Sequence, residues 1–528
     1  MLAKRTFPEQ PYELLKAVLG TFSFVMMKLQ NAKTSLKRFR TMLFGASTES
    51  KRNLQGKSAG ADTGEKSSDA PGAAPTEGSP EVNPETPTKK PRKGHGRNGA
   101  AKYRDAPVVA VALPDLKSGD VCPSCIDGKV YDSPPRTLVK VIGQPPLVAT
   151  IVKLEQLRCR LCDAIFTAPL PEGMSPSKYD HSCASMLAVL RYGSGMPFYR
   201  LEGLQGNLNV PLPDATQWDI VANAVDAPRT VFHELIHQAA QGDLLHIDDT
   251  RAKILSIIVQ RAKSEAAGKT VDAKAINTSG IVAELHTGRQ VVLFLTGHNH
   301  AGDNLNDVLK QRAKTLAAPI QMSDALACNF VGEFKRIFAN CLTHARRQFV
   351  DVIEHFPEPC RYVIDVFAKI YANDAHCRDR KMSPEDRLRH HQAHSAKPMQ
   401  ELHVWMNEQF DQHLVEPNSG LGKALRYLLN HWVELTLFLR MAGVPLDNNI
   451  CERALKQAIL HRKNSMFYKT ANGAAVGDIY MSIVHTCQLN QVNPFEYLQA
   501  LMIHIEKVQA NVALWLPWNY REQLAGAP

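Results

Sequence analysis

The sequence lacks a long hydrophobic run, since no uninterrupted apolar stretch approaches the roughly 18 residues of a membrane-spanning helix. Near its start, Lys4, Arg5, Glu9 and Glu13 interrupt the apolar residues, which argues against a secretory signal. Acidic residues are scarcer than basic ones, 52 against 62, so the net charge is +10. These absences predict a soluble, cytoplasmic protein with no membrane segment. The excess of positive charge favours a polyanionic partner such as nucleic acid.

Cysteine is present in an odd number, 11, which does not suit a framework of disulfides. Four cysteines form two CxxC pairs, Cys122 with Cys125 and Cys159 with Cys162, separated by a β-rich stretch. Two such pairs place four thiolates at the corners of a tetrahedron, the closed geometry of a structural Zn²⁺ site. A redox role is disfavoured because the pairs flank strands and do not open a helix. We therefore expect a zinc ribbon over residues 107–172.

Large apolar residues are almost absent from residues 55–106, which are rich in Gly, Ala, Ser, Pro and charge and end in a basic run. This composition predicts a disordered basic linker that adds sequence-independent phosphate contacts. Residues 1–54 carry apolar residues in alternating steps of three and four, which predicts a coiled coil that pairs copies of the chain. A helical hairpin or a basic helix on DNA would fit the same spacing. The seam consists of Leu15, Val18, Phe22, Val25, Leu29, Ala32, Leu36, Phe39 and Leu43.

Residues 173–237 have a helical pattern throughout. A helix through Leu204, a turn at residues 210–213 and a second helix capped by Asp214 and carrying Trp218 resemble a helix-turn-helix. Generic helical packing explains the pattern about equally well. DNA recognition by this segment is therefore one of two open alternatives.

Residues 238–335 change to β-branched apolar runs of strand length. The runs are DLLHIDDTRAKIL, SGIVAELH and RQVVLFLTG, followed by a helical segment and the short strand PIQMSDAL. Three strands, a helix and a fourth strand match the front half of an RNase H-like fold. In that fold the first and fourth strands each deliver an aspartate, here Asp248, with Asp249 as its competitor, and Asp324.

The chain between the second aspartate and the next candidate carboxylate is too long for a loop. Helical, polar sequence over residues 336–443 predicts a helical insertion into the core. It contains Cys341 and His344, which we expect to orient or pack and not to bind zinc. His390 and His394 share a helix face in the same segment, but exposed histidines on a polar helix are much commoner than metal ligands.

Residues 444–470 contain a helix with one apolar and one charged face. Asp447 is its expected N-cap, and the charged face carries Glu452 ahead of the basic residues Arg462 and Lys463. One carboxylate beside basic groups suits a metal-binding acid next to a phosphate backbone, although a solvated helix face would look the same. A helical region at residues 471–528 completes a multidomain α+β chain. The expected buried face holds Ile450, Cys451, Ala454, Leu455, Ala458 and Ile459.

Several motifs occur together in one order along the chain. They are FRTMLFGASTESK near the N-terminus, the two CxxC pairs, GMPFYR, DDT at 248–250, SDAL at 323–326, CLTHARRQF at 341–349, and PLDNNICERALK followed by HRKNSMF. Together they resemble the transposases of insertion sequence 66, over nearly the whole chain except the linker. The chain departs from many relatives after Asp324, where it has Ala325 and Leu326 in place of glycine and tyrosine.

This resemblance implies a DDE transposase, in which Asp248, Asp324 and Glu452 hold two Mg²⁺ ions, or Mn²⁺. Carboxylates are the hard oxygen ligands that Mg²⁺ prefers, and two ions activate the attacking oxygen and neutralise the phosphodiester. Asp249 falls where many relatives have glutamate, which implies a structural role. The motif positions and their charge imply contacts with the DNA backbone by Arg346, Arg347, Arg462 and Lys463.

We therefore expect a bacterial transposase of the nucleoid that binds the terminal repeats of its element and target DNA. Its coiled coil should assemble a homo-oligomer, and a need for accessory proteins is left open. Two other interpretations remain, a zinc-ribbon DNA-binding protein that has lost catalysis and a stand-alone metal-dependent nuclease. The presence of all three acids argues against the first, and joining of a second DNA molecule would exclude the other.

Overall fold

The computed structural model describes residues 108–525 apart from 109, 112, 114, 124–127, 134–137, 142–143, 161, 163–164, 268–274 and 331. The expected coiled coil and linker lie outside the described residues. The chain divides into two compact units, one comprising Met1–Ser47 and Pro146–Pro528 and the other Thr48–Pro145. Among the described residues, no helix is both long and apolar enough to cross a lipid bilayer.

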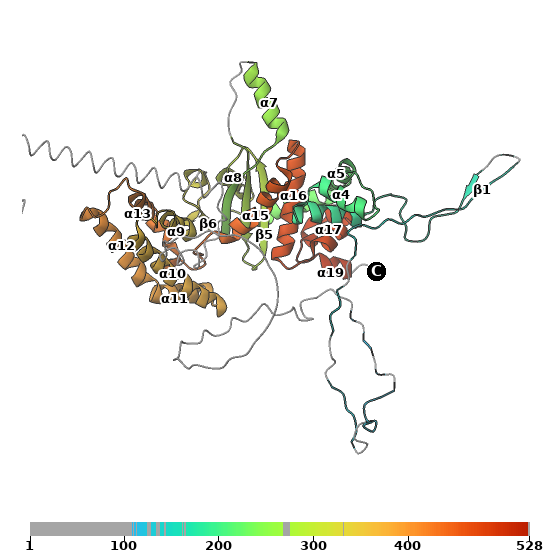
Figure 1. Ribbon diagram of the computed structural model, residues 1–528, viewed down its shortest axis with the longest axis horizontal. Helices are drawn as coiled ribbons and strands as arrows, with labels where there is room; N and C mark the ends of the chain where they lie inside the picture. The colour runs from blue at the N-terminus through green and yellow to red at the C-terminus, as the bar shows by residue number, and fades with distance from the viewer. Residues whose placement is uncertain are drawn as a thin grey trace, which may run out of the picture. The chain divides into compact units, whose positions relative to one another are not determined.

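A mixed five-stranded sheet forms the centre of the larger unit (Figure 1). Its strand order is β5-β4-β3-β6-β7, with β3 antiparallel to β4 and parallel to β6. The outer pairs repeat this difference, since β4 and β5 are antiparallel and β6 and β7 are parallel. Together with the surrounding helices, the sheet fits the predicted α+β class. The strands are β3 (Leu244–Arg251), β4 (Asn277–Glu284), β5 (Gln290–Gly297), β6 (Ile320–Ser323) and β7 (Ile337–Asn340).

Strand β7 corrects the prediction that residues 336–443 are helical throughout. Ile337–Asn340 pairs with β6 in parallel, with Asn340 opposite Ser323. Four residues are too few to show a strand period in the sequence, and the neighbouring strand selects the extended backbone. The earlier strands overlap the predicted runs, whereas helix α8 (Ala301–Leu309) begins and ends earlier than the helix predicted over residues 304–316.

The helices before the sheet share its hydrophobic core. Leu187, Val221 and Leu235 are fully buried in the same cluster as Val292 of β5. The predicted helix pair is present as α4 and α5, joined by residues 208–213, but Pro213 takes the N-cap position predicted for Asp214. The helices are α3 (His181–Ala188), α4 (Phe198–Asn207), α5 (Asp214–Asn223) and α6 (Asp226–Ala240), with a π-helical turn at Val189–Gly193.

Helix α16 (Ala471–Leu489) covers the outer edge of β5 with a ladder of side-chain hydrogen bonds. Four residues of a helix rise about 6 Å, and two residues of a strand rise about 6.7 Å. Side chains four residues apart on α16 therefore meet backbone N–H groups two residues apart on β5. The edge that would otherwise offer unpaired N–H groups to another strand is thereby satisfied. The side-chain oxygens of Asn490, Thr486, Ser482 and Asp478 accept hydrogen bonds from the backbone N–H groups of Gln290, Val292, Phe294 and Thr296, respectively.

The predicted helical insertion follows β7 and has its own hydrophobic cluster. Leu244, Met322 and Ala339 of the sheet belong to this cluster, so the insertion packs directly against the β3, β6 and β7 strands. Its helices are α9 (Leu342–Val350), α10 (Pro357–Asp379), α11 (Pro384–His394), α12 (Ala396–Asp411), α13 (Gly420–Asn430) and α14 (Trp432–Leu435).

After the insertion, α15 (Asn449–Ser465) returns to the sheet and lies against β3 and β4 (Figure 1). The C-terminal helices α17 (Pro494–Ile503), α18 (Ile505–Ala510) and α19 (Tyr520–Ala525) complete the larger core. Helix α7 (Leu255–Ala266), between β3 and β4, buries none of its residues.

Candidate active site

Asp248 lies in the second half of β3, and Asp324 directly follows β6, the adjacent parallel strand. The register pairs Leu244 with Ile320 and His246 with Met322, and this constant offset brings residue 248 opposite residue 324. Neighbouring strands are about 4.8 Å apart. The sheet therefore brings the two predicted aspartates together at one edge.

Asp249 faces the opposite side of the sheet because side chains alternate along a strand. Its carboxylate accepts a hydrogen bond from the Ser279 hydroxyl at 2.7 Å and from the backbone N–H of Ala301 at 2.9 Å. His300 Nδ1 lies 3.1 Å from the same carboxylate. Asp249 thus ties the first turn of α8 to β3 and β4, an arrangement that fits a structural acid.

Asn448 fixes the start of α15 against the sheet. Its side-chain amide donates to the carbonyl of Ile247 at 2.8 Å, and its Oδ1 atom pairs with Nδ1 of buried His246 at 3.0 Å. Its backbone N–H donates to Cys341 Sγ at 3.2 Å. Asn448, and not Asp447, is the N-cap residue, while the carboxylate of Asp447 accepts the N–H of Asn449.

Close approach between α15 and β4 requires the glycine at position 280. A Cβ atom there would lie 2.9 Å from Leu455 Cγ, and Cys451 Sγ already donates to the Gly280 carbonyl at 3.3 Å. The predicted apolar face accordingly packs on the sheet through Cys451, Ala454, Leu455 and Ala458, whereas Ile450 and Ile459 are half-buried.

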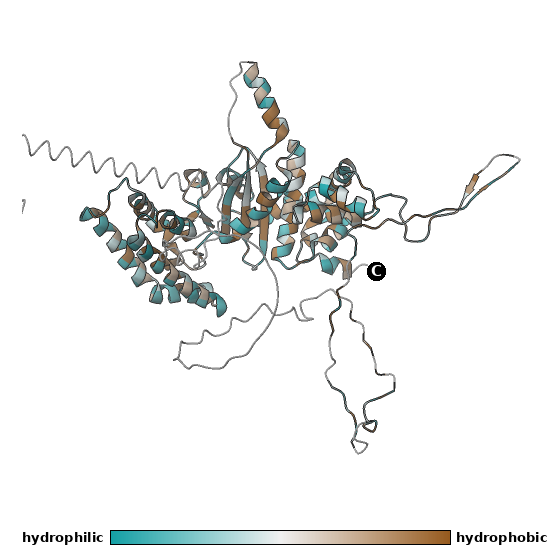
Figure 2. Ribbon diagram, viewed as in Figure 1, coloured by the Kyte–Doolittle hydropathy of each residue, from teal (hydrophilic) through white to brown (hydrophobic). Residues whose placement is uncertain are grey.

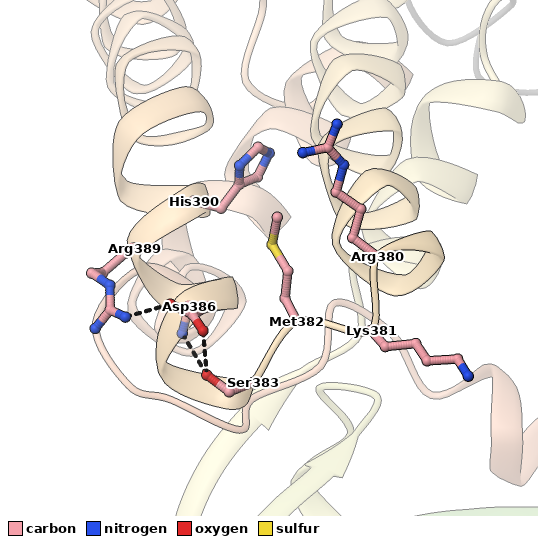
Figure 3. A pocket seen from close by; sticks show the side chains of 7 residues that line it. All are labelled: Arg380, Lys381, Met382, Ser383, Asp386, Arg389 and His390. Atoms are coloured by element: carbon pink, nitrogen blue, oxygen red, sulfur yellow. Dashed lines mark hydrogen bonds and ion pairs between the residues drawn. The ribbon is translucent and has the colours of Figure 1, made fainter.

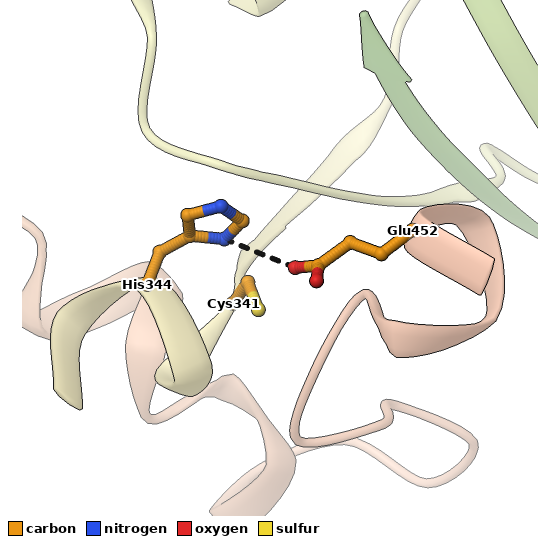
Figure 4. A group of neighbouring side chains, drawn as sticks. All are labelled: Cys341, His344 and Glu452. Carbon is orange, nitrogen blue, oxygen red and sulfur yellow. Dashed lines mark ion pairs between the residues drawn. The ribbon is translucent and has the colours of Figure 1, made fainter. Parts of the chain in front are cut away.

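Glu452, one turn into α15, points toward His344 of α9 and Cys341 at the end of β7 (Figure 4). His344 Nδ1 and Glu452 Oε1 are 3.7 Å apart, and one potential ligand atom from each of the three residues lies within 4.8 Å of the others. Both facing atoms are buried, and neither has a hydrogen-bond partner among the described residues. The three side chains could therefore hold a metal ion, whereas the sequence led us to expect only orientation or packing by Cys341 and His344.

The carboxylates influence one another electrostatically. Burial raises the pKa of Asp248 to about 7, and the charges of Asp324 and Glu452 contribute to the increase. Burial also raises the pKa of Asp324, while nearby His344 lowers it. Mutual repulsion among buried carboxylates is relieved by a divalent cation, and their oxygen atoms are the ligands that Mg²⁺ prefers. By its chemistry the donor set of Asp248, Asp324 and Glu452 therefore suits the implied metal, whereas among the described residues it is Cys341, His344 and Glu452 whose ligand atoms lie within 4.8 Å of one another.

Further residues reach Asp324 that motif reasoning did not assign to the site. Asn329 donates a hydrogen bond from its amide to Asp324 Oδ1, and the backbone N–H of Leu326 approaches the same atom at 3.4 Å. Burial raises the pKa of the Tyr427 phenol in the insertion to about 12, and the charge of Asp324 contributes to the increase. Leu326 and Asn329 directly follow Asp324 in the chain, whereas Tyr427 comes from α13, and only the departure after Asp324 signalled a different environment there.

The four basic residues implied to contact DNA have different surroundings. Arg462 donates from Nη1 to Thr250 Oγ1 and to the backbone carbonyl of Arg251, so it links α15 to the end of β3. Lys463 is exposed beside it. Arg346 and Arg347 lie on α9, the first half-buried and the second exposed.

Three histidines of the insertion form a cluster, one member of which lines a basic concavity. The centroid of the His390 ring lies 5.1 Å from that of His376 and 4.4 Å from that of His394. His390 also lines an open cavity of about 600 Å³ between α10 and α11 (Figure 3). Among the described residues, the three histidines do not form a group compact enough to hold a metal ion. The lining residues are Arg380, Lys381, Met382, Ser383, Asp386, Arg389 and His390.

The first CxxC pair lies in the unit Thr48–Pro145. Val121 and Lys129 form an isolated antiparallel bridge, and the N–H of Cys122 donates to the carbonyl of Gly128 at 2.7 Å. Cys122 is therefore on one arm of a tight β-loop, and Cys125 is outside the described residues.

The second CxxC pair belongs to the larger unit. There β1 (Gln156–Arg158) pairs with β2 (Ile165–Thr167) in antiparallel fashion, and Cys159 and Cys162 lie between them. The described cysteines of the two pairs, Cys122, Cys159 and Cys162, thus lie next to short β segments, while zinc binding itself stays a prediction.

Comparison with known proteins assigns the chain to a family. The family model described as "Transposase IS66 family" matches residues 176–476, more than half of the chain. Two relatives from Sinorhizobium fredii (strain NBRC 101917 / NGR234) are described as uncharacterized proteins. The protein y4jD is 31% identical over 192 residues, which are 36% of this chain and 37% of y4jD. The protein y4hP is 23% identical over 396 residues, which are 70% of this chain and 68% of y4hP.

The alignment with y4jD thus spans about a third of that protein's length. No solved structure matches the chain significantly. The matching family region includes both aspartates and Glu452. The chain therefore belongs to the IS66 family of transposases.

Proposed function

We propose that this transposase is a DDE enzyme, which binds the ends of an insertion sequence and catalyses metal-dependent cleavage and transfer of DNA strands. The observation that carries the proposal is the convergence of three carboxylates. Asp248 comes from β3, Asp324 follows the adjacent β6, and Glu452 comes from α15, which is anchored on β3 by Asn448. The charges of Asp324 and Glu452 both act on Asp248.

The sheet supports an RNase H-like core. Three antiparallel strands in sequence are followed by a helix and two parallel strands, and β3 occupies the centre of the order. Because β3 and β6 are parallel and in constant register, Asp248 of β3 comes opposite Asp324, which directly follows β6. The helical insertion separates this part of the core from α15.

The chain's own residues position the three acids. The backbone N–H of Asp249 donates to Asp248 Oδ1 at 2.8 Å, and Asn329 donates to Asp324. His344 faces Glu452 from α9 and restricts the directions in which that carboxylate can turn. When bound, divalent cations would lower the pKa of an attacking water or 3′-hydroxyl and neutralise the phosphodiester.

Recognition and assembly use other parts of the chain in this proposal. The zinc ribbon would bind structural Zn²⁺ through Cys122, Cys125, Cys159 and Cys162 and contact the terminal repeats. The N-terminal coiled coil would pair protomers. Basic side chains, with Arg346, Arg347 and Lys463 among them, would contact the phosphate backbone.

The test compares wild type with Glu452→Gln in cleavage and strand transfer, on DNA carrying the element's own ends with Mg²⁺ or Mn²⁺. We expect both activities to fall at least about a hundredfold, because one charged oxygen ligand is lost, while end binding is kept. Glu506→Gln, an exposed residue of α18, is the matched control.

Equal cutting and joining by Glu452→Gln would contradict the proposal. Cleavage without joining by the wild type would instead identify a nuclease. End binding with neither activity would favour the non-catalytic DNA-binding protein.

A further inference from the structure

Five exposed hydrophobic side chains lie on two segments whose backbones pair, the first turns of α7 and the residues after α15. Leu255, Ile258 and Val259 are 37%, 41% and 44% exposed on α7, and Met466 and Phe467 are 68% and 43% exposed after α15. Figure 2 shows the hydrophobic residues on the turns of α7 nearest the sheet. We name this group the apolar ledge.

Backbone hydrogen bonds join the two halves of the ledge. Tyr468 N–H donates to the Lys253 carbonyl at 2.8 Å, and Leu255 N–H donates to the Tyr468 carbonyl at 2.8 Å. Ser256 N–H donates to the Lys469 carbonyl at 3.1 Å. The ledge is therefore a built surface of two paired segments.

Met466 has a backbone conformation that few residues other than glycine adopt. Its φ is 64° and its ψ is −43°, and the N–H of Phe467 donates to the carbonyl of Ser465 at 2.8 Å. These values describe a γ-turn with positive φ, a rare and strained form. The strain turns a large hydrophobic side chain toward solvent, which packing alone does not explain.

The ledge is connected to the candidate active site through β3 and α15. Asp248 is on β3, whose last residue, Arg251, is bonded through its carbonyl to Arg462 of α15. Fourteen residues of helix separate Glu452 from Met466, roughly 20 Å along the axis. That length corresponds to about six stacked base pairs.

The surroundings of the ledge are strongly basic. Residues 251–267 and 462–470 contain one acid, Glu265, against seven basic residues. Such charge complements the phosphate backbone, but phosphates gain nothing from apolar side chains. The basic residues are Arg251, Lys253, Arg261, Lys263, Arg462, Lys463 and Lys469.

We propose that the apolar ledge binds unpaired DNA bases next to the cleavage site, while the basic residues around it hold the phosphates. Side chains such as Met, Leu, Ile and Phe contact or wedge between bases where a duplex is opened. A second copy of the chain would be a poor occupant, because it would bring the same positive charge to the surface. The inference rests on the proposed function.

Binding without added Mg²⁺ or Mn²⁺ tests the ledge independently of catalysis. The probes are two fluorescent DNAs with the same labelled strand, one a paired 30-mer and one with its last four nucleotides unpaired. The test variant is Val259→Ser with Met466→Gly, because glycine accepts the positive φ and removes only the side chain. The control is Val433→Ser, 65% exposed on α14.

Wild type and control should prefer the opened DNA about tenfold, in line with the contribution of one stacked base. The double variant should reduce this preference below about twofold and leave binding of paired DNA within about twofold, since the phosphate contacts are kept. A variant that keeps the preference, or a wild type that has none, overturns the proposal. A changed oligomeric state with the preference kept also overturns it and makes the ledge a contact between copies.

The two proposals can fail separately. Preference for opened DNA by a chain that neither cuts nor joins would uphold the ledge and overturn the proposed function. Cleavage and joining by a chain that has no preference for opened DNA would uphold the proposed function and overturn the ledge.

Discussion

Asp248 and Asp249 are neighbours in sequence with opposite surroundings. The first belongs to a group of mutually repelling carboxylates, whereas the second accepts hydrogen bonds from Ser279 and Ala301. The alternation of side chains along β3 is enough to separate them. A strand thus supplies one acid for chemistry and one for the fold.

Matched alanine substitutions should separate these two residues. Asp249→Ala leaves the Ser279 hydroxyl and Ala301 N–H without their acceptor and should lower the free energy of unfolding by about 1–3 kcal/mol. Asp248→Ala removes a buried, repelled charge and should leave the melting temperature of the metal-free protein equal or higher. Thermal unfolding and strand cleavage measure the two effects.

The expected pattern is a stable, inactive Asp248→Ala and a less stable Asp249→Ala that still cleaves below its melting temperature. The reverse pattern would show that Asp249 is the acid of the site.

At the residue scale, the sequence predicted three carboxylates, whose catalytic role stays a prediction, but not the residues around them. Asp324 could be placed because it ends a recognisable strand that pairs with β3. His344 and Tyr427 reach the site from distant segments, and a single sequence contains no signal for such contacts. His344 was noticed in the CLTHARRQF motif, yet its position beside Glu452 depends on how α9 and α15 pack.

At the scale of elements, α16 and β5 show how a helix can protect a sheet edge. Asp478 is the buried member of the ladder that bonds twice to Thr296, to the N–H and to the hydroxyl, both at 2.6 Å. Burial raises the pKa of Asp478 to about 7, although the two hydrogen bonds oppose the increase. The folded protein therefore keeps a proton that the unfolded chain loses near pH 4.

This pKa predicts a specific pH dependence of stability. Between the unfolded pKa near 3.8 and the folded pKa near 7, the native state binds more protons, so the free energy of unfolding should fall as pH rises. The slope is at most about 1.4 kcal/mol per pH unit for one group. Asp478→Asn, which resembles the protonated acid, should flatten it.

Asp248 titrates in the same range, so the comparison belongs in an Asp248→Asn background. Denaturant unfolding from pH 4 to 8 gives the slope. If the pH slope of the free energy of unfolding is the same in Asp248→Asn and in Asp248→Asn with Asp478→Asn, the Asp478 carboxyl group is ionised in the folded protein.

Elements of ordinary length were predictable, and short ones were not. Strands β3, β4 and β5 and helix α8 follow the apolar patterns of the sequence. Strand β7 has four residues and depends on β6 for its form. Helix α7 buries no residue. Its apolar residues therefore do not form the buried face from which a helix is predicted in a sequence.

At the scale of the whole molecule, the helical region before the sheet is part of the sheet's own core, since α3, α5 and α6 contribute to one cluster. The sequence could not show this, because packing between distant segments has no local pattern. Helix α5 exposes Asp214 and Asp219 and contains no lysine or arginine. Its surface is poorly suited to phosphates, so the alternative of generic packing gains support.

The β1–β2 hairpin contrasts with that packed core. All six of its strand residues are exposed, and Leu157, Ile165 and Phe166 are at least 61% exposed. A two-stranded hairpin is marginally stable in water without such packing. Metal coordination at Cys159 and Cys162 would supply the missing stabilisation, as structural zinc does in small domains.

We therefore predict about one Zn²⁺ per chain in protein purified without chelators. Cys159→Ser should release most of this zinc, because the site loses one thiolate, and should increase proteolysis near residues 156–167. Melting of the sheet should be unchanged, since the hairpin contributes no residue to its hydrophobic clusters. Cys328→Ser, outside both CxxC pairs, is the control and should keep its zinc. Equal zinc content in Cys159→Ser and wild type would show that the hairpin holds no metal, and the CxxC pairs would then need another explanation.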